Sequence, residues 1–282
     1  MPSPPEILPL TEIQFRQVSL PHVHGLFQVR TIVPDRPGSV IAVHHVQAQT
    51  EINLIANVMA ETHIDSSDTK TVMTKMGYQY KDNQNFKPAL IRARARQWAE
   101  ALCALSGLTG YVIKALYQGQ TVGVALVIRL DRNVSVLPSP MSDPTPTTST
   151  DELNLFSPRE MAAFAFCKAK DVEMSSELSR ELNTCVDHYG RGLTWGLFGV
   201  GVKEEFRQNE IGRTLVQQAF SVIPSGNVII SQAMPESVGM HLAIGFKFEK
   251  SPENGRLRSV RVSPEWSPGF AMEFLMMSFK KP

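Results

Sequence analysis

The spacing of apolar side chains predicts a chain of alternating helices and strands. Apolar residues recur every three or four positions over 51–62 and again over 91–105, which is the period of a helix with one buried face. Two runs rich in Val, Ile, Leu and Tyr then flank Gln118-Gly119, a pair of residues typical of a tight turn. The pattern therefore predicts two helices followed by a β-hairpin over 111–130.

The last third of the chain continues this alternation. Residues 193–202, LTWGLFGVGV, read as an apolar strand with three glycines, which indicate the close approach of another backbone or of a ligand. An amphipathic helix begins near 208–212, and a further strand is predicted at 227–233. The pattern ends with a short helix over 235–243 and an apolar strand over 270–279.

Proline placement sets the expected domain organisation. Seven prolines fall within residues 1–38, which predicts an N-terminal extension ahead of a single domain over 39–282. Residues 137–151 combine four prolines with a Ser/Thr cluster and are predicted to form a flexible loop. A helical insertion is predicted over 157–186, because Ser157-Pro158-Arg159-Glu160 is a capping box with proline at the first helical position.

Charge and composition exclude several classes of function. The 28 Lys and Arg against 27 Asp and Glu leave a net charge of +1, whereas nucleic-acid binders and polybasic membrane-surface proteins carry a basic face. No apolar run approaches the ~18 residues that span a bilayer, and the first residues do not resemble a secretion signal. The three cysteines form no C-x-x-C pair, and the histidine pairs lack further ligands. We therefore expect a cytoplasmic protein with no nucleic-acid partner, no membrane partner and no metal.

The polar loop after the glycine-rich strand is the candidate site for an anion. The helix that follows this loop presents unpaired backbone N–H groups, and such helix N-termini bind phosphate groups. Lys203, Arg207 and Arg213 lie in or beside the loop and can assist by charge. We expect a phosphate or diphosphate on the amides of residues 208–212.

This order of elements, with Arg207-x-x-x-x-Gly212 in the loop, resembles the GCN5-related N-acetyltransferases. The turn over 233–235 and Gly245-Phe246 after the short helix carry the resemblance further. It covers about residues 84–282. The resemblance implies an α+β fold of the acyl-CoA N-acyltransferase type, with a central, mostly antiparallel twisted sheet flanked by helices.

In that family the end of the glycine-containing strand pairs with the pantetheine arm of coenzyme A, and the loop amides hold the diphosphate. The resemblance therefore implies acetyl-CoA as acyl donor and an N-acetyltransferase that moves the acetyl group to an amine of a small-molecule acceptor by direct attack in a ternary complex. The cofactor-binding residues that it implies are Phe198, Gly199, Val200, Gly201, Val202, Arg207, Gln208, Asn209, Glu210, Ile211, Gly212 and Arg213.

Two positions depart from the family pattern. The loop pattern of that family is Arg/Gln-x-x-Gly-x-Gly/Ala, in which Arg207 fits the first position and Gly212 the last. Glu210 replaces the middle glycine of this pattern and adds a carboxylate where a diphosphate would approach. Its side chain either points outward and pairs with Arg213 or Arg207, or weakens the binding of coenzyme A. His241 replaces a tyrosine four residues before Gly-Phe. It is either the catalytic general acid that protonates the departing thiolate or a half-buried histidine at a helix end.

These departures leave other functions open. One is a binding protein that keeps the fold without turnover, and another is an enzyme of this fold that decarboxylates or cyclises a thioester-linked substrate. No general base is evident. Asp187-His188 could form an acid–base pair and Ser231-Gln232 could order a water, but these residues, like Glu204 and Glu205, are more simply explained as ordinary surface or core residues. Pairing of sheet edges would allow a homodimer.

Overall fold

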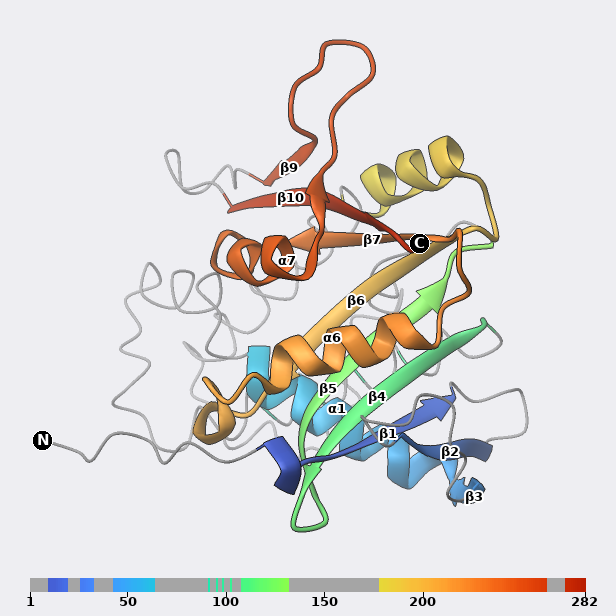
Figure 1. Cartoon of the computed structure of the whole chain (residues 1–282), viewed down its shortest axis with the longest axis vertical. Coiled ribbons are helices and arrows are strands. Elements are labelled where there is room, and N and C mark those ends of the chain that lie inside the picture. The colour runs from blue at the N-terminus through green and yellow to red at the C-terminus, as the bar shows by residue number, and fades with distance from the viewer. Residues whose placement is uncertain are drawn as a thin grey trace, which may run out of the picture.

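The computed structural model describes residues 10–19, 26–32, 43–63, 91, 95, 98, 102, 108–131, 178–262 and 272–282, and the strands within these residues form one sheet. The order of the strands is β3-β2-β1-β4-β5-β6-β7-β10-β8, and β9 pairs with β10 (Figure 1). The strands are β1 (Gln14–Ser19), β2 (Leu26–Ile32), β3 (Val43–Gln47), β4 (Gly110–Tyr117), β5 (Gln120–Arg129), β6 (Thr194–Val202), β7 (Val228–Ala233), β8 (Lys247–Phe248), β9 (Ser259–Val262) and β10 (Met272–Lys280).

Helices cover both faces of this sheet. Figure 1 shows α6 in front of the strands and α1 behind them. The named helices are α1 (Ala48–His63), α6 (Ile211–Ser221) and α7 (Val238–Ile244), and a further helix runs over 178–189. Short 3₁₀ turns lie at Leu10–Glu12, Glu204–Phe206 and Pro235–Ser237.

Strand β5 shows how the two faces are built. Residues 121–128 are all buried, and over 124–128 successive side chains enter opposite clusters of the core. Leu126 packs on the side of α1 and helix 178–189, whereas Val127 packs on the side of α6. The continuous apolar run in this strand is therefore explained by cover on both faces.

The predicted fold class is confirmed: the sheet is mostly antiparallel and flanked by helices. The predicted hairpin is also confirmed as β4 and β5. Gln118 and Gly119 both have positive φ, 48° and 81°, which is the two-residue turn that matches the twist of paired strands. Residues 91, 95, 98 and 102 of the predicted second helix are helical.

The predicted domain boundary at residue 38 is wrong for the described part of the N-terminal segment. Strand β1 lies between β2 and β4, and Phe15 is only 1% exposed. In the sequence the prolines of this segment flank the two strands and do not interrupt them. Because proline is tolerated at strand ends, its density alone does not indicate an extension outside the sheet.

Some sequence predictions lie outside the described residues. These are the flexible loop at 137–151 and the part of the insertion 157–186 that precedes residue 178. Strand β9 was not predicted. No helix in the described part of the chain is long and apolar enough to cross a membrane.

Candidate functional site

Strands β6 and β7 form the one parallel pair among the described strands, and they separate part of the way along. They pair only from Thr194 with Val228 to Leu197 with Ser231. Beyond Leu197, β6 continues to Val202 alongside β5 alone. Figure 1 shows the two strands meeting at one end and diverging toward the other. One backbone edge of residues 198–202 therefore has no strand partner within the described sheet.

A β-bulge marks the point of separation. The register between β5 and β6 shifts at Phe198, so that Phe198 and Gly199 both lie on the α1 side of the sheet. A Cβ on Gly199 would collide with the Met59 side chain, and one on Gly201 would collide with Thr62. Side chains of α1 therefore approach both glycines closely, whereas the sequence predicts the approach of a backbone or of a ligand.

The loop after β6 leads directly to the N-terminus of α6. Val200 and Val202 pack on the α6 side of β6, and Ile211, in the first turn of α6, is buried. The first bond of the helix runs from the Thr214 amide to the Glu210 carbonyl at 2.9 Å. The amides of Ile211, Gly212 and Arg213 therefore have no acceptor within the helix, because these positions precede its first turn of hydrogen bonds.

The conformation of the loop explains why a glycine suits position 210. Glu210 adopts φ 56° and ψ 4°, and Gln208 has φ 68°. This left-handed region costs a residue with a side chain about 1 kcal/mol, whereas glycine enters it freely. Asn209, 5% exposed, fixes the turn by donating its side-chain amide to the Phe206 and Arg207 carbonyls. The loop thus keeps its shape although its glycine is missing.

Each cation predicted to assist an anion contacts a group of the protein. Arg213 pairs with the Glu210 carboxylate at 3.4 Å, and Lys203 pairs with Glu61 of α1 at 3.0 Å. Arg207 donates to the carbonyls of Val202 at 3.0 Å and Thr62 at 3.3 Å. Because the two ion pairs are at least partly exposed to solvent, each contributes at most about 1 kcal/mol. The Glu210 side chain points outward and pairs with Arg213, which is the first of the two alternatives that the sequence left open.

His241 is a buried residue of α7 that bonds through both ring nitrogens. It is 4% exposed, and Ser231, its partner on β7, is also 4% exposed. His241 Nε2 lies 2.8 Å from Ser231 Oγ, and Nδ1 lies 2.8 Å from the Ser237 carbonyl oxygen. Burial lowers the pKa of His241 below its ordinary value, and the bond to the Ser237 carbonyl opposes this shift. The ring is therefore neutral at pH 7.

The other candidate residues have ordinary structural roles. Asp187 pairs with Arg191 at 2.7 Å on the surface. Glu204 and Glu205 are exposed in the 3₁₀ turn after β6. Gln232 donates to the Leu178 carbonyl at 2.6 Å on the opposite face from Ser231. No group of metal-binding side chains is present among the described residues.

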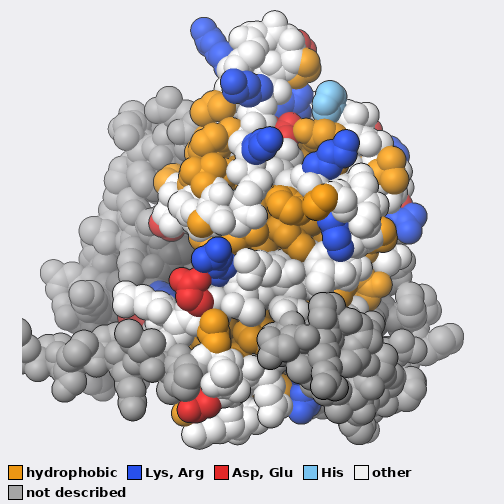
Figure 2. All heavy atoms as spheres, viewed as in Figure 1, with side chains coloured by type: hydrophobic (Ala, Val, Ile, Leu, Met, Phe, Trp, Pro, Cys, Tyr) orange, Lys and Arg blue, Asp and Glu red, His pale blue; other side chains and the backbone are white. Residues whose placement is uncertain are grey.

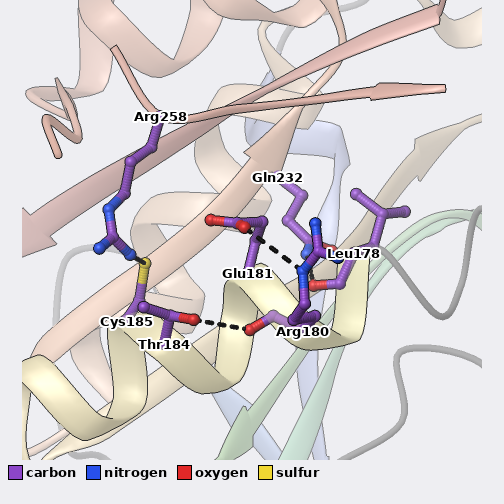
Figure 3. A network of polar contacts seen from close by, with 7 residues as sticks. All are labelled: Leu178, Arg180, Glu181, Thr184, Cys185, Gln232 and Arg258. Carbon is purple, nitrogen blue, oxygen red and sulfur yellow. Dashed lines mark hydrogen bonds and ion pairs between the residues drawn. The ribbon is translucent and has the colours of Figure 1, made fainter. Parts of the chain in front are cut away.

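A polar network attaches helix 178–189 to the sheet on that opposite face (Figure 3). It includes the Gln232 bond to the Leu178 carbonyl and a 3.7 Å contact from Arg258 to the sulfur of Cys185. Burial raises the pKa of Cys185 to about 11, so its thiol stays protonated at neutral pH and is not an activated nucleophile.

The pairing of Ser231 with His241 was not predicted. The sequence names Ser231 only together with Gln232, among several residues considered as a general base, and gives it no partner. The missing information is tertiary, because α7 must fold back over β7 before the imidazole reaches the hydroxyl. A polar residue at an inward position of a strand was the available signal.

The surface of this side of the molecule is chemically mixed. Figure 2 shows Lys and Arg side chains scattered among apolar ones, and they do not gather in a single basic patch. Any anion at the start of α6 would therefore be held chiefly by local amides and a few nearby cations.

The order of these elements defines the class of the fold. A hairpin is followed by β6, the loop, α6 and the parallel strand β7, then α7 and the last strand β10. This is the arrangement that the resemblance to the GCN5-related N-acetyltransferases implied, and the chain has that fold.

The comparisons with known proteins find matches among solved structures. No protein-family model and no curated protein sequence matches the chain. Among solved structures, arylalkylamine N-acetyltransferase 2 from Aedes aegypti is 14% identical, with a TM-score of 0.46, over 83% of this chain and 96% of that one. An N-acetyltransferase from Staphylococcus aureus Mu50 is 11% identical, with a TM-score of 0.39, over 82% and 93%. The PaiA N-acetyltransferase from Thermoplasma acidophilum, solved with coenzyme A, is 12% identical, with a TM-score of 0.37, over 83% and 94%.

Proposed function

We propose that this protein is an acyl-CoA-dependent N-acyltransferase that moves an acetyl group from acetyl-CoA to an amine of a small-molecule acceptor in a ternary complex. The observation that carries the proposal is the separation of β6 from β7 immediately before the open N-terminus of α6. An unpaired strand edge and a set of unbonded helix amides lie only a few residues apart. This combination suits an extended ligand with an amide-containing arm and a diphosphate.

The residues present fit the two parts of such a ligand. The edge of Phe198–Val202 offers backbone groups to the amides of a pantetheine arm, as an added strand would. The amides of Ile211, Gly212 and Arg213 offer donors to the diphosphate. Arg213 and Lys203 can turn from their exposed carboxylate partners toward the phosphates. Acetyl-CoA would supply the activated acyl group as its thioester.

Titration calorimetry with acetyl-CoA tests the proposal, with free coenzyme A and ADP as controls. We expect saturable one-site binding of acetyl-CoA and of coenzyme A. At ~100 times Kd the ligand should stabilise the protein by about 2.7 kcal/mol, which a thermal-shift assay detects. Absence of heat at millimolar acetyl-CoA would contradict the proposal. If acetyl-CoA binds, the release of free thiol is measured next in the presence of spermidine, tryptamine or glucosamine, which represent three classes of amine.

A second function, binding without turnover, is favoured by one observation. His241 stands where the family pattern has a tyrosine, and its one ring proton is held by the Ser237 carbonyl at 2.8 Å, so it is not free to protonate a departing thiolate. Binding of acetyl-CoA with no transfer to any amine of the panel would support this alternative. Thiol release with any one of the amines would exclude it.

A further inference from the structure

The hydroxyl of Ser231 and the imidazole of His241 form a buried pair with a defined proton arrangement. The Ser237 carbonyl can only accept a hydrogen bond, so Nδ1 of His241 must carry the proton in their 2.8 Å contact. In the neutral ring Nε2 then has a lone pair and no proton. The 2.8 Å contact to Ser231 is therefore a bond from the serine hydroxyl to the ring.

This arrangement suits a base and does not suit the general acid that the sequence resemblance implied. The one proton on the neutral ring is held by the backbone carbonyl of Ser237, at the end of the 3₁₀ turn that precedes α7. The free lone pair of His241 points at Ser231, as the base does in a pair formed by a hydroxyl and an imidazole. Phe246 packs against the ring edge with centroids 5.0 Å apart and restricts its rotation.

The pair lies at the point where β6 and β7 separate. Ser231 is the β7 residue aligned with Leu197, the last residue of β6 that is paired with β7. The unpaired edge of β6 begins at the next residue, Phe198. A thioester whose pantetheine arm follows that edge would place its reacting end near this junction.

We propose that Ser231 is the proton acceptor for the incoming amine and that His241 accepts the proton of Ser231. The acceptor enters as an ammonium ion and gives one proton to Ser231 Oγ, while the serine hydroxyl proton passes to Nε2 of His241. The free amine then attacks the thioester, so that a C–N bond forms and the C–S bond breaks. The second amine proton goes to the thiolate, and the imidazolium returns its proton to solvent. Ser231 is the catalytic residue, and His241 acts through it.

The inference rests on the proposed function, and the test separates the two. Acetyl-CoA binding by calorimetry and thiol release with the amine panel are measured first on the wild-type protein. If it neither binds nor transfers, the proposed function fails and the relay fails with it. If it binds and transfers, the variants decide the relay alone.

The decisive variant is Ser231→Ala, and the chain offers a matched control. Thr194, 0% exposed, lies at the other end of the β6–β7 pairing and donates its hydroxyl to the Gly190 carbonyl at 2.9 Å. Thr194→Val therefore also removes one buried hydroxyl from the same strand pair. We expect Ser231→Ala to lower kcat about 100-fold or more while its Kd for coenzyme A stays within about twofold. Thr194→Val should keep kcat, and Ser231→Thr, which restores a hydroxyl, should recover most of it.

Two further measurements test the direction of proton transfer. In ¹⁵N-histidine spectra, with His241→Gln used for assignment, His241 should show a protonated Nδ1 and an unprotonated Nε2. Mass spectrometry after incubation with acetyl-CoA alone should find no acetyl group on Ser231. The relay is overturned by a protonated Nε2 in the neutral ring, by an acetylated Ser231, which would make it a nucleophile, or by Ser231→Ala with unchanged kcat.

Discussion

The two ends of helix α6 differ in whether a side chain caps them. At the C-terminal end, Lys281 donates its ammonium group to the carbonyls of Phe220 at 2.8 Å, Ser221 at 3.3 Å and Ile223. At the N-terminal end, Glu210 makes no side-chain cap, and its carboxylate turns away to Arg213. A helix leaves unbonded groups at both ends, and a protein usually satisfies them with its own side chains. Here the protein caps the C-terminal end with a side chain, whereas the N-terminal end has no side-chain cap and is the end to which the proposed function assigns the diphosphate.

The contrast between the two ends extends to their backbone. The capped end is held by the last strand, since the Lys281 amide donates to the Asn227 carbonyl at 2.9 Å and the Gly226 amide donates to the Lys281 carbonyl. The open end is a loop with two left-handed residues, Gln208 and Glu210. Unfavourable backbone geometry is typically retained where function requires it. We therefore expect changes at the two ends to separate stability from binding.

The largest effect is expected from placing a charge on the open end. Gly212→Asp adds a carboxylate in the first turn of α6, where its Cβ would meet only ordinary contacts with Val202 and Met240. It should weaken acetyl-CoA binding about 100-fold, because the new carboxylate occupies the amides and repels the diphosphate. The same carboxylate should stabilise the folded protein by about 0.5 kcal/mol through its interaction with the helix dipole. Calorimetry and thermal unfolding measure the two effects on the same samples.

Gly212→Asn is the control for this change. It has the same shape and the same capacity to bond to the amides, but it carries no charge. If Gly212→Asp and Gly212→Asn bind acetyl-CoA as tightly as the wild type, the start of α6 does not hold the diphosphate.

The next effect is expected at the capped end. Lys281→Met removes three donors from carbonyls that have no other charged partner among the contacts described above. The free energy of unfolding should fall by about 1–2 kcal/mol, while acetyl-CoA binding stays unchanged. Urea unfolding followed by circular dichroism measures the loss. Lys280→Met, at an exposed neighbouring position, should change little, and an equal loss in both variants would show that the cap contributes nothing.

The elements that the sequence predicted well are those set by local chemistry. The β4–β5 hairpin follows from the turn at Gln118-Gly119, and α6 follows from the spacing of Ile211, Leu215 and Ala219. Strand β1 was missed as part of the sheet because its partners, β2 and β4, are fixed by pairing and not by its own composition.

The candidate site also contains features that local sequence predicts and contacts that only tertiary packing creates. The loop and the first turn of α6 could be located from the sequence, because helix periodicity is a local property. Position 210 was singled out by the family resemblance, and its left-handed backbone is seen only in the structure. The partners of the site residues could not. Glu61 reaches Lys203, and Thr62 reaches Arg207, only after α1 packs on β6. The Ser231–His241 bond likewise depends on how α7 lies over β7.

A smaller gain in affinity is expected from removing the carboxylate at the open end. Glu210→Gly relieves the left-handed backbone and removes a like charge near the diphosphate, so acetyl-CoA binding should tighten about two- to fivefold. Glu210→Gln removes the charge and keeps the backbone cost. Calorimetry on both variants therefore divides the gain between charge and conformation. Weaker binding in both would mean that Glu210 assists the ligand.

The smallest effect is expected from releasing Lys203. Its ammonium group lies 3.0 Å from the Glu61 carboxylate, and both side chains are partly exposed. Glu61→Gln should therefore leave stability nearly unchanged. It should strengthen acetyl-CoA binding about twofold, because Lys203 no longer has to leave the Glu61 carboxylate in order to contact the diphosphate. Glu12→Gln, in the 3₁₀ turn before β1, is the control for an overall change in charge. If the two variants bind alike, Lys203 does not reach the diphosphate, and the donors at the start of α6 are the backbone amides with Arg213.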